Sequence, residues 1–371
     1  MKIEKIELRH TKMELVSPFE TSLGVELFEE HIMVRIDCEG VTGWGEVVVE
    51  PSPSYSYETL TTAWHVLSDF VIPSILGKDF PDIRNAIAPF GWVRGHRMAK
   101  AGVEAALSDA FAKSKGISLS AFLGGTRTKV PVGVSVGLQT TPAKLVAVIG
   151  AYLEDGYNRI KIKIAPGRDI ELVKAVRKEY PDILLQVDAN SAFTLDDVKL
   201  FQEMDDYNLQ LIEQPLGYDD IYDHSLLQRE IKSAICLDES IYNVSDTKAA
   251  IALGACKNIN IKPGRVGGYT ESIRIHDYCA SVNIPVWHGG MDESGIARGG
   301  NVALASLPNF ILPGDISASK RYYKKDIVEP EFVINKEDST MNVPDEPGIG
   351  VEVNMTELEK VTVKKAAFSS K

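Results

Sequence analysis

The chain has 371 residues, of which 44% are hydrophobic, and a formal net charge of −12. This length suits two domains or one barrel with an addition, and the acidic balance argues against binding to nucleic-acid phosphates. No apolar run approaches the length of a membrane span, and residues 1–7 alternate like a strand rather than a signal peptide. The four cysteines lack CxxC spacing, so we expect reduced thiols in a cytoplasmic protein. From the charge and the lack of a long apolar run, we expect no nucleic-acid or membrane partner.

Residues 1–125 are predicted to form a small α+β domain. Strand-like alternation covers residues 2–15, 30–38 and 42–50, and helical patterns follow at about 57–75 and 98–115. Strands that are followed by helices indicate an α+β unit rather than an alternating β/α unit. The pair Gly124-Gly125 is the expected boundary.

Eight strand-like runs follow this boundary, with helical segments between them. The runs cover residues 130–136, 159–164, 184–188, 209–213, 235–238, 258–262, 284–288 and 310–315. Helical patterns include residues 170–180, 195–204, 268–282 and 295–307. Eight strands at this spacing close a parallel barrel, and no clear helix follows the last strand. We therefore expect an α/β protein with a (β/α)7β TIM-like barrel at 126–320, whose segment 321–371 returns to complete an N-terminal capping domain.

Five charged residues lie at a nearly constant spacing, and each ends an apolar run. They are Lys163, Asp188, Glu213, Asp238 and Lys262, with separations of 25, 25, 25 and 24 residues. About 25 residues make one strand, one helix and two loops, so five successive strands would each place one charged group at the same end. This pattern predicts an active site at the C-terminal mouth of the barrel.

The three acidic members of this set predict a metal site. A single Asp or Glu at a strand end is more often a helix cap or a loop charge, but three in register are not explained that way. Inward carboxylates repel one another unless a cation neutralises them, and Asp188, Glu213 and Asp238 offer the oxygen ligands that Mg²⁺ or Mn²⁺ prefers. The set contains no His or Cys, which argues against zinc. Asn190 and Glu239 lie beside these ligands and are expected to support them.

The lysines predict proton transfer. Alternate residues of a strand share a face, so Lys161 and Lys163 point the same way, towards the barrel interior or, on an edge strand, towards solvent. Lys262 would stand across the barrel from Lys163. Two such groups on either side of a metal-bound substrate suit removal of a proton α to a carboxylate, with Lys161 and the metal favouring a neutral base at Lys163.

These residues carry a resemblance to a known family. The Lys-x-Lys pair, the Asp/Glu/Asp set and the opposing lysine resemble the muconate-lactonising subgroup of the enolase superfamily, whose sites are known to use Lys or His bases with Mg²⁺. The segments 262–268 and 287–298 and the Ser17-Pro18-Phe19 motif are similar to the branch that contains o-succinylbenzoate synthases and N-acylamino acid racemases.

The resemblance implies roles for further residues. Phe19 would lie on a mobile capping loop, Gly289, Gly290 and Met291 would line the substrate pocket, and Arg265 would support the site. Lys163 would abstract the α-proton and then assist the departure of hydroxide. Lys262 would stabilise the intermediate, or act on the opposite face in a racemisation.

The resemblance also implies the activity, which is Mg²⁺-dependent syn-dehydration by an o-succinylbenzoate synthase of menaquinone biosynthesis. The closest alternative is an N-acylamino acid racemase, followed by a muconate cycloisomerase and a dipeptide epimerase. Epimerases carry an Asp-x-Asp pair where this chain has only Asp315, and His288 lacks the partner Asp of a His–Asp dyad, so it is expected to pack or to form a hydrogen bond. A metal-dependent hydrolase would usually need histidines on its strands, and the first strand, residues 130–136, has none. A non-catalytic scaffold would not need Lys163 and Lys262 on opposite faces. We expect a small carboxylate substrate and a homo-oligomer.

Overall fold

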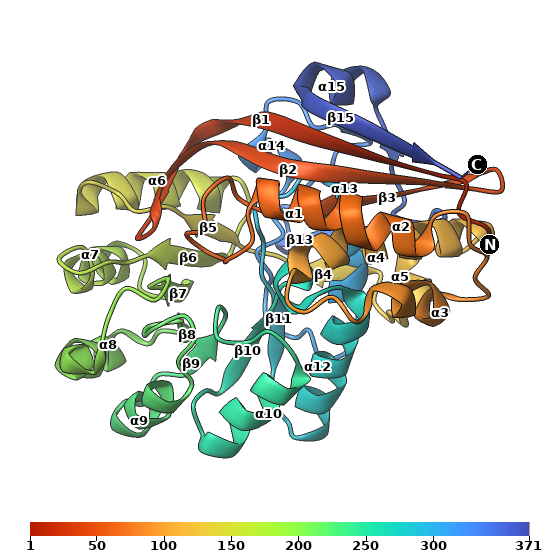
Figure 1. The fold of residues 1–371 in the computed structure, drawn as a ribbon. Helices are drawn as coiled ribbons and strands as arrows, with labels where there is room; N and C mark the ends of the chain where they lie inside the picture. The colour runs from red at the N-terminus through yellow and green to blue at the C-terminus, as the bar shows by residue number, and fades with distance from the viewer. Residues whose placement is uncertain (371) are drawn as a thin grey trace.

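The computed structural model describes residues 1–370 and contains two sheets of different kinds (Figure 1). A four-stranded antiparallel sheet lies above a seven-stranded parallel sheet that curls into a barrel. The first and last described segments lie together at one end of the antiparallel sheet, where Lys5 pairs with Ser369. The predicted fold class is confirmed: the barrel is capped by an N-terminal α+β unit that the C-terminal strand completes.

The capping sheet has the order β15-β1-β2-β3. Its strands are β1 (Lys5–Thr21), β2 (Gly24–Cys38), β3 (Val41–Val47) and β15 (Thr362–Ser369). The first two strands are longer than the sequence predicts, because residues 16–29 form the outer half of a β1–β2 hairpin. Alternation in the sequence does not reveal this half, because Val25 and Leu27 are exposed while Glu29 is buried.

Helices cover one face of this sheet. They are α1 (Leu60–Val66), a π-helical turn (Leu67–Val71), α2 (Ile72–Ile75), α3 (Ile83–Ile87), a 3-10 turn (Ala88–Phe90), α4 (Arg97–Ser114) and α5 (Leu119–Leu123). The Ala-rich α4 packs closely on β3, where a Cβ at Gly45 would lie 2.1 Å from the carbonyl oxygen of Gly102. Only small residues allow this approach, which buries the apolar face of the sheet.

The barrel sheet has the order β11-β10-β9-β8-β7-β6-β5, with neighbouring strands parallel. Its strands are β5 (Val134–Val136), β6 (Arg159–Lys163), β7 (Leu184–Asp188), β8 (Leu211–Glu213), β9 (Ile235–Leu237), β10 (Asn258–Ile261) and β11 (Val286–His288). The branched side chains Ile160 and Ile162 of β6 face outward under the helices, which leaves its basic residues facing the interior.

Two predicted barrel strands differ from the structure. The run 130–136 is divided into β4 (Lys129–Pro131), which pairs with β13 (Thr340–Asn342), and β5. The run 310–315 forms only isolated bridges, from Phe310 to Val286 and from Gly314 to Val132. Pro313 cannot donate a backbone hydrogen bond, which prevents a regular ladder. The segment still closes the ring between β11 and β5, since Asp315 N donates to His288 O at 2.8 Å.

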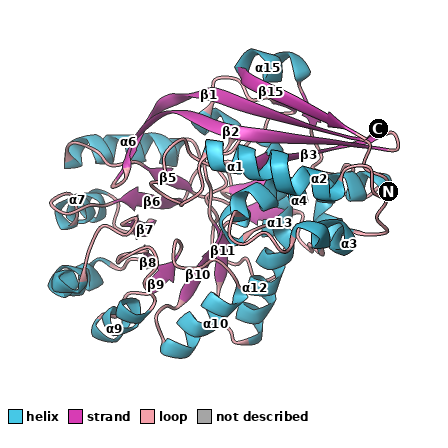
Figure 2. Cartoon of the chain, in the orientation of Figure 1, coloured by secondary structure: helices cyan, strands magenta, loops and turns pink. Residues whose placement is uncertain are grey.

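Helices surround the barrel strands (Figure 2). They are α6 (Pro142–Glu154), α7 (Ile170–Glu179), α8 (Val198–Met204) between 3-10 turns (Leu195–Asp197 and Asp205–Tyr207), α9 (Tyr222–Glu230), α10 (Val244–Leu253), α11 (Pro263–Val266), α12 (Tyr269–Ser281) and α13 (Gly295–Ala305). The C-terminal part adds α14 (Ser319–Tyr322), β12 (Val328–Glu329), β14 (Glu352–Val353) and α15 (Met355–Val361). Within residues 1–370, no helix has the length and hydropathy to cross a bilayer.

Candidate active site

The structure brings the five regularly spaced charged residues together at the carboxyl ends of the barrel strands. Lys163 pairs in register with Asp188, and Asp188 with Glu213. Glu213 pairs with Cys236, and Asp238 lies two residues further on, so it shares the same face. Lys262 directly follows β10. All five side chains are buried, so each must find a partner of opposite charge.

Each carboxylate at the mouth has a cationic partner. Lys163 Nζ lies 2.7 Å from Asp188 Oδ2, and Lys161 Nζ lies 2.7 Å from Glu213 Oε2. Lys262 Nζ lies 2.9 Å from Asp238 Oδ2, and Arg265 contacts the other carboxylate oxygen of Asp238, Oδ1. Burial would raise the pKa of Asp188, but the ammonium groups of Lys163 and Lys161 outweigh burial and hold that pKa well below its usual range.

The residues present fit a hard divalent cation. Burial and the nearby charge of Asp188 raise the pKa of Glu213, and they raise the pKa of Glu239 to about 7. Among the described residues, Oε2 of Glu239 and Oδ2 of Asp238 have no hydrogen-bond donor, although Lys262 is an ion-pair partner of Asp238. Two buried carboxylate oxygens are thus without a donor, and all of these groups offer the oxygen ligands that such a cation prefers.

Neighbouring polar residues fix the lysines and the carboxylates in place. Lys163 donates to Asn190 Oδ1 at 2.7 Å, and Asn190 Nδ2 donates to Glu239 Oε1 at 3.2 Å. Asn190 and Glu239 thus lie beside the acidic set. Tyr55, which the 25-residue spacing does not indicate, reaches over from the capping domain and donates from its hydroxyl to Asp238 Oδ1 at 3.1 Å. The Tyr55 ring also faces Lys262, with the ammonium group 4.4 Å from its centroid.

A second buried ion-pair group lies deeper in the barrel. Asp315 accepts from Arg159 at 2.6 Å and lies 2.6 Å from Lys161 Nζ. Burial alone would lower the pKa of Lys161, but Asp315, Glu213 and Asp188 outweigh it and raise that pKa well above the usual value. Lys161 is therefore a permanent cation that positions carboxylates, and Asp315 is the partner that keeps it and Arg159 in the interior.

His288 is a packed residue. It is buried, and among residues 1–370 neither of its ring nitrogens has a hydrogen-bond partner. Burial lowers its pKa to about 3, so the ring is neutral near pH 7. It packs near Phe310, with ring centroids 6.1 Å apart. These contacts give it no role as a base.

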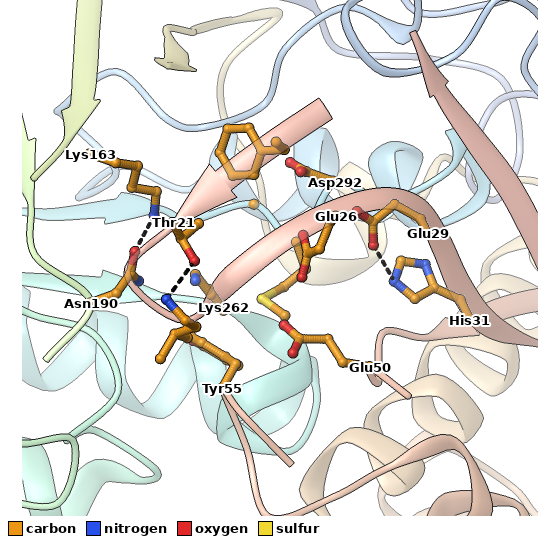
Figure 3. A pocket seen from close by; sticks show the side chains of 14 residues that line it. Thr21, Glu26, Glu29, His31, Glu50, Tyr55, Lys163, Asn190, Lys262 and Asp292 are labelled. Atoms are coloured by element: carbon orange, nitrogen blue, oxygen red, sulfur yellow. Dashed lines mark hydrogen bonds and ion pairs between the residues drawn. The ribbon is translucent and has the colours of Figure 1, made fainter. Parts of the chain in front are cut away.

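A cavity of about 70 Å³ lies between the barrel mouth and the capping hairpin (Figure 3). Its lining residues are Phe19, Thr21, Leu23, Glu26, Glu29, His31, Glu50, Tyr55, Lys163, Asn190, Lys262, Gly290, Met291 and Asp292. Typical ligand pockets measure roughly 300–1,000 Å³, so this cavity is too small for a substrate in its present form. The hairpin must move to admit one.

Backbone contacts hold the β1–β2 hairpin against the barrel. Leu138 N donates to Glu20 O at 2.7 Å, and Ser22 Oγ donates to Ala189 O at 3.1 Å. Arg168 forms an ion pair with Glu20 at 2.7 Å. Phe19 is 8% exposed, and its ring centroid lies 5.9 Å from Lys163 Nζ. The hairpin is therefore closed over the site, with Phe19 above the lysine.

The three residues expected to line the pocket after β11 take different places. Gly290 and Met291 line the cavity, but Gly289 is not among its lining residues. A Cβ at Gly289 would lie 2.2 Å from Oδ1 of Asn260, whose amide donates to Glu213. Because Gly289 has no side chain, there is room for Asn260, whose amide orients Glu213. Neither Tyr55 nor Asn260 stands at a strand end in the 25-residue pattern, so spacing alone gives no signal for them.

Comparisons with known proteins agree with this geometry. Residues 3–124 match the N-terminal domain family of mandelate racemase and muconate-lactonising enzyme, and residues 144–357 match the enolase C-terminal domain-like family. The chain is 50% identical to an o-succinylbenzoate synthase from Bacillus subtilis, over 100% of this chain and 99% of that protein. It is 47% identical to an N-succinylamino acid racemase from Amycolatopsis, over 100% of both chains.

A solved structure has the same fold. A member of the enolase superfamily from Listeria innocua superimposes with a TM-score of 0.95 at 40% identity, covering 100% of this chain and 99% of that chain. The two family matches and this superposition together cover both domains. The chain belongs to the enolase superfamily, in the group of mandelate racemase and muconate-lactonising enzyme.

Proposed function

We propose that this enzyme is an o-succinylbenzoate synthase that also racemises N-succinylamino acids. The observation that carries the proposal is the placement of Lys163 and Lys262 on different strands, both lining one cavity beside three strand-end carboxylates. Relatives at 50% and 47% identity with these two names support both activities. The two reactions share one step, the removal of a proton α to a carboxylate.

We propose that Asp188, Glu213 and Asp238 hold the divalent cation, Mg²⁺ or Mn²⁺. The ion supplies positive charge that stabilises the dianion formed when the α-proton leaves. Lys163 abstracts that proton and later donates one to the departing hydroxide. A lysine acts as a base only in its neutral form. Asp188 Oδ2 lies 2.7 Å from Lys163 Nζ and holds that amine at the strand end.

Lys262 is suited to stay protonated. Burial opposes its charge, but Tyr55, Glu213 and Glu239 outweigh burial and raise its pKa well above that of a free lysine. As an ammonium group it stabilises negative charge on the intermediate, or donates a proton from the opposite face. A racemase needs each lysine to act as base in one direction. Because the raised pKa of Lys262 makes its neutral form scarce, we expect dehydration to be the main reaction and racemisation the slower one.

A dipeptide epimerase is disfavoured by one observation. The Asp315 carboxylate is engaged by Arg159 and Lys161, each at 2.6 Å. This carboxylate is thus not free to hold a substrate ammonium group. Burial would raise the pKa of Asp315, but Lys161 and Arg159 outweigh burial and hold that pKa below its usual range. Muconate cycloisomerisation has no observation in its favour beyond the shared fold.

The remaining proposals concern the setting of the enzyme. An o-succinylbenzoate synthase would serve menaquinone biosynthesis in the cytoplasm, and we expect a homo-oligomer. We also propose domain limits of 1–125 for the capping domain, 126–320 for the barrel and 321–371 for the returning segment. Genes of menaquinone synthesis beside this one would support the biological role, whereas genes of amino-acid processing would favour the racemase.

The function is tested by assaying purified protein with both substrates. We expect turnover of the hydroxy-acid precursor of o-succinylbenzoate and slower racemisation of an N-succinylamino acid. EDTA should abolish both activities, and Mg²⁺ or Mn²⁺ should restore them, because three buried carboxylates lose their cation and then regain it. No turnover of either substrate in the presence of Mg²⁺ would refute the proposal, and full activity in metal-free protein would refute the metal.

The capping hairpin gives a separate prediction. Phe19→Ala removes the ring that covers Lys163, so kcat/KM should fall by about 10–100-fold, because closure then excludes water less well. Phe28→Ala is the matched control, because Phe28 lies on the same hairpin but is 41% exposed. Kinetics and thermal unfolding of both variants check this. A collapse in the melting temperature of Phe19→Ala would identify Phe19 as a core residue instead of a cover for the site.

A further inference from the structure

The outer part of the capping hairpin turns its acidic side chains inward and its apolar side chains outward. Glu29 is only 7% exposed and Glu26 is half-buried, while Val25 and Leu27 are 58% and 52% exposed. The hydrophobic effect alone would favour the opposite arrangement. An inward carboxylate therefore needs a reason other than packing.

These carboxylates converge with a third one from the barrel. One carboxylate oxygen from each of Glu26, Glu29 and Asp292 lies within 4.8 Å of the other two. Among residues 1–370, no other three His, Cys, Asp or Glu side chains bring their ligand atoms this close together. Asp292 comes from the loop after β11, so the group joins the hairpin to the barrel. Figure 3 shows the three side chains at one side of the cavity and Lys163 at the other.

Positive charge reaches two members of this group only from a distance: Arg321 and Lys163 act on Asp292, and Lys163 and His31 act on Glu26. Within the described chain, Glu26 and Asp292 form no ion pair with a lysine or arginine, and Oε1 of Glu29 has no hydrogen-bond partner. The other oxygen of Glu29 is 3.7 Å from His31, whose Nδ1 is already bonded to Glu46 at 2.7 Å. A buried carboxylate oxygen without a partner is costly.

The repulsion within the group is reflected in its protonation. Burial, together with Glu50 and Asp292, raises the pKa of Glu26 to about 7. Burial also raises the pKa of Glu29 well above the usual value, and Asp292 and Glu26 add to that effect. The three carboxylates thus repel one another in a buried position.

We propose that Glu26, Glu29 and Asp292 form a second divalent-cation site, separate from the three strand-end carboxylates. Three oxygen ligands at this spacing suit Mg²⁺, Mn²⁺ or Ca²⁺. Two ligands lie on β2 and one follows β11, so the ion would fasten the closed hairpin to the barrel.

The role of this ion in catalysis rests on the proposed function. Both proposed substrates carry a succinyl group, whose terminal carboxylate is negative near neutral pH. This group enters a cavity lined by the carboxylates of Glu26, Glu29, Glu50 and Asp292. The second ion would cancel the repulsion between this wall and the substrate.

The test is to count the Mn²⁺ ions bound by purified protein, using equilibrium dialysis and electron paramagnetic resonance of the free ion. We expect two ions per wild-type chain, and one in Glu29→Gln and in Asp292→Asn. Glu30→Gln is the matched control and should keep both ions, since Glu30 is the next residue but is paired with His10 and Lys12. Asp238→Asn should lose the strand-end ion and retain the second.

Two outcomes would overturn the inference: a single ion per wild-type chain, or two ions retained in folded Glu29→Gln and Asp292→Asn. Asp292 is half-buried in a loop, so its variant gives the answer if Glu29→Gln does not fold. One ion in an enzyme with full synthase activity would refute this site and leave the proposed function standing. Two ions in a protein that turns over neither substrate would support this site and refute the proposed function.

Discussion

Replacing Lys163 by alanine is expected to lower kcat/KM for the dehydration by about 10⁴-fold or more. A positioned general base contributes roughly 10²–10⁴-fold, and here one lysine serves twice: its neutral amine abstracts the proton, and the resulting ammonium group donates a proton to the departing hydroxide. The fold should survive, because Asp188 keeps its second partner, Lys161, at 3.1 Å. Steady-state kinetics and circular dichroism of the variant measure both effects.

A lysine outside the site provides the control for this experiment. Lys174 lies on α7 and pairs with Glu171 and Glu203, each at 2.9 Å on the exposed side of the helix. Lys174→Ala removes the same side chain and should leave kcat/KM unchanged. A loss of less than tenfold in Lys163→Ala would mean that another group removes the proton.

Asp315→Ala is expected to lower the free energy of unfolding by about 3–5 kcal/mol, the usual cost of leaving a buried charge without its partner. Arg159 is fully buried and Lys161 is 3% exposed, and both lie 2.6 Å from this carboxylate. Lys161 still contacts Glu213 and Asp188, so most of the loss should arise at Arg159. Urea unfolding monitored by circular dichroism gives the difference.

The matched control for this prediction is Asp338→Ala. Asp338 pairs with Lys129 at 3.1 Å, but both side chains are about half exposed. Exposed pairs of this kind contribute at most about 1 kcal/mol, because water screens the charges. Equal losses in the two variants would show that the Arg159–Asp315 pair does not stabilise the barrel interior.

The regular features of the molecule could be predicted from sequence because a single repeating geometry produces them. The spacing from Lys163 to Lys262 reflects successive β/α units, and the strand register then places the charged groups on one face. The returning C-terminal segment could also be predicted, since no helix pattern follows Asp315.

Other features depend on contacts that sequence spacing does not encode. The run 310–315 looks apolar and strand-like, yet Pro313 limits it to isolated bridges. Tyr55 reaches the site from a capping loop 183 residues before its partner Asp238. The inward turn of Glu26 and Glu29 reverses the usual burial pattern of a strand, so the outer hairpin could not be predicted by alternation.

Proton exchange at the α-carbon tests the central claim most directly, because it reports on each lysine separately. Each enantiomer of an N-succinylamino acid is incubated in D₂O with Lys163→Ala or Lys262→Ala, and loss of the α-proton signal is followed by NMR. We predict that each variant exchanges the α-proton of one enantiomer without racemising it, and that the two variants act on opposite enantiomers. If Lys163→Ala exchanges both enantiomers at the wild-type rate, Lys163 is not the base and the proposed mechanism is wrong.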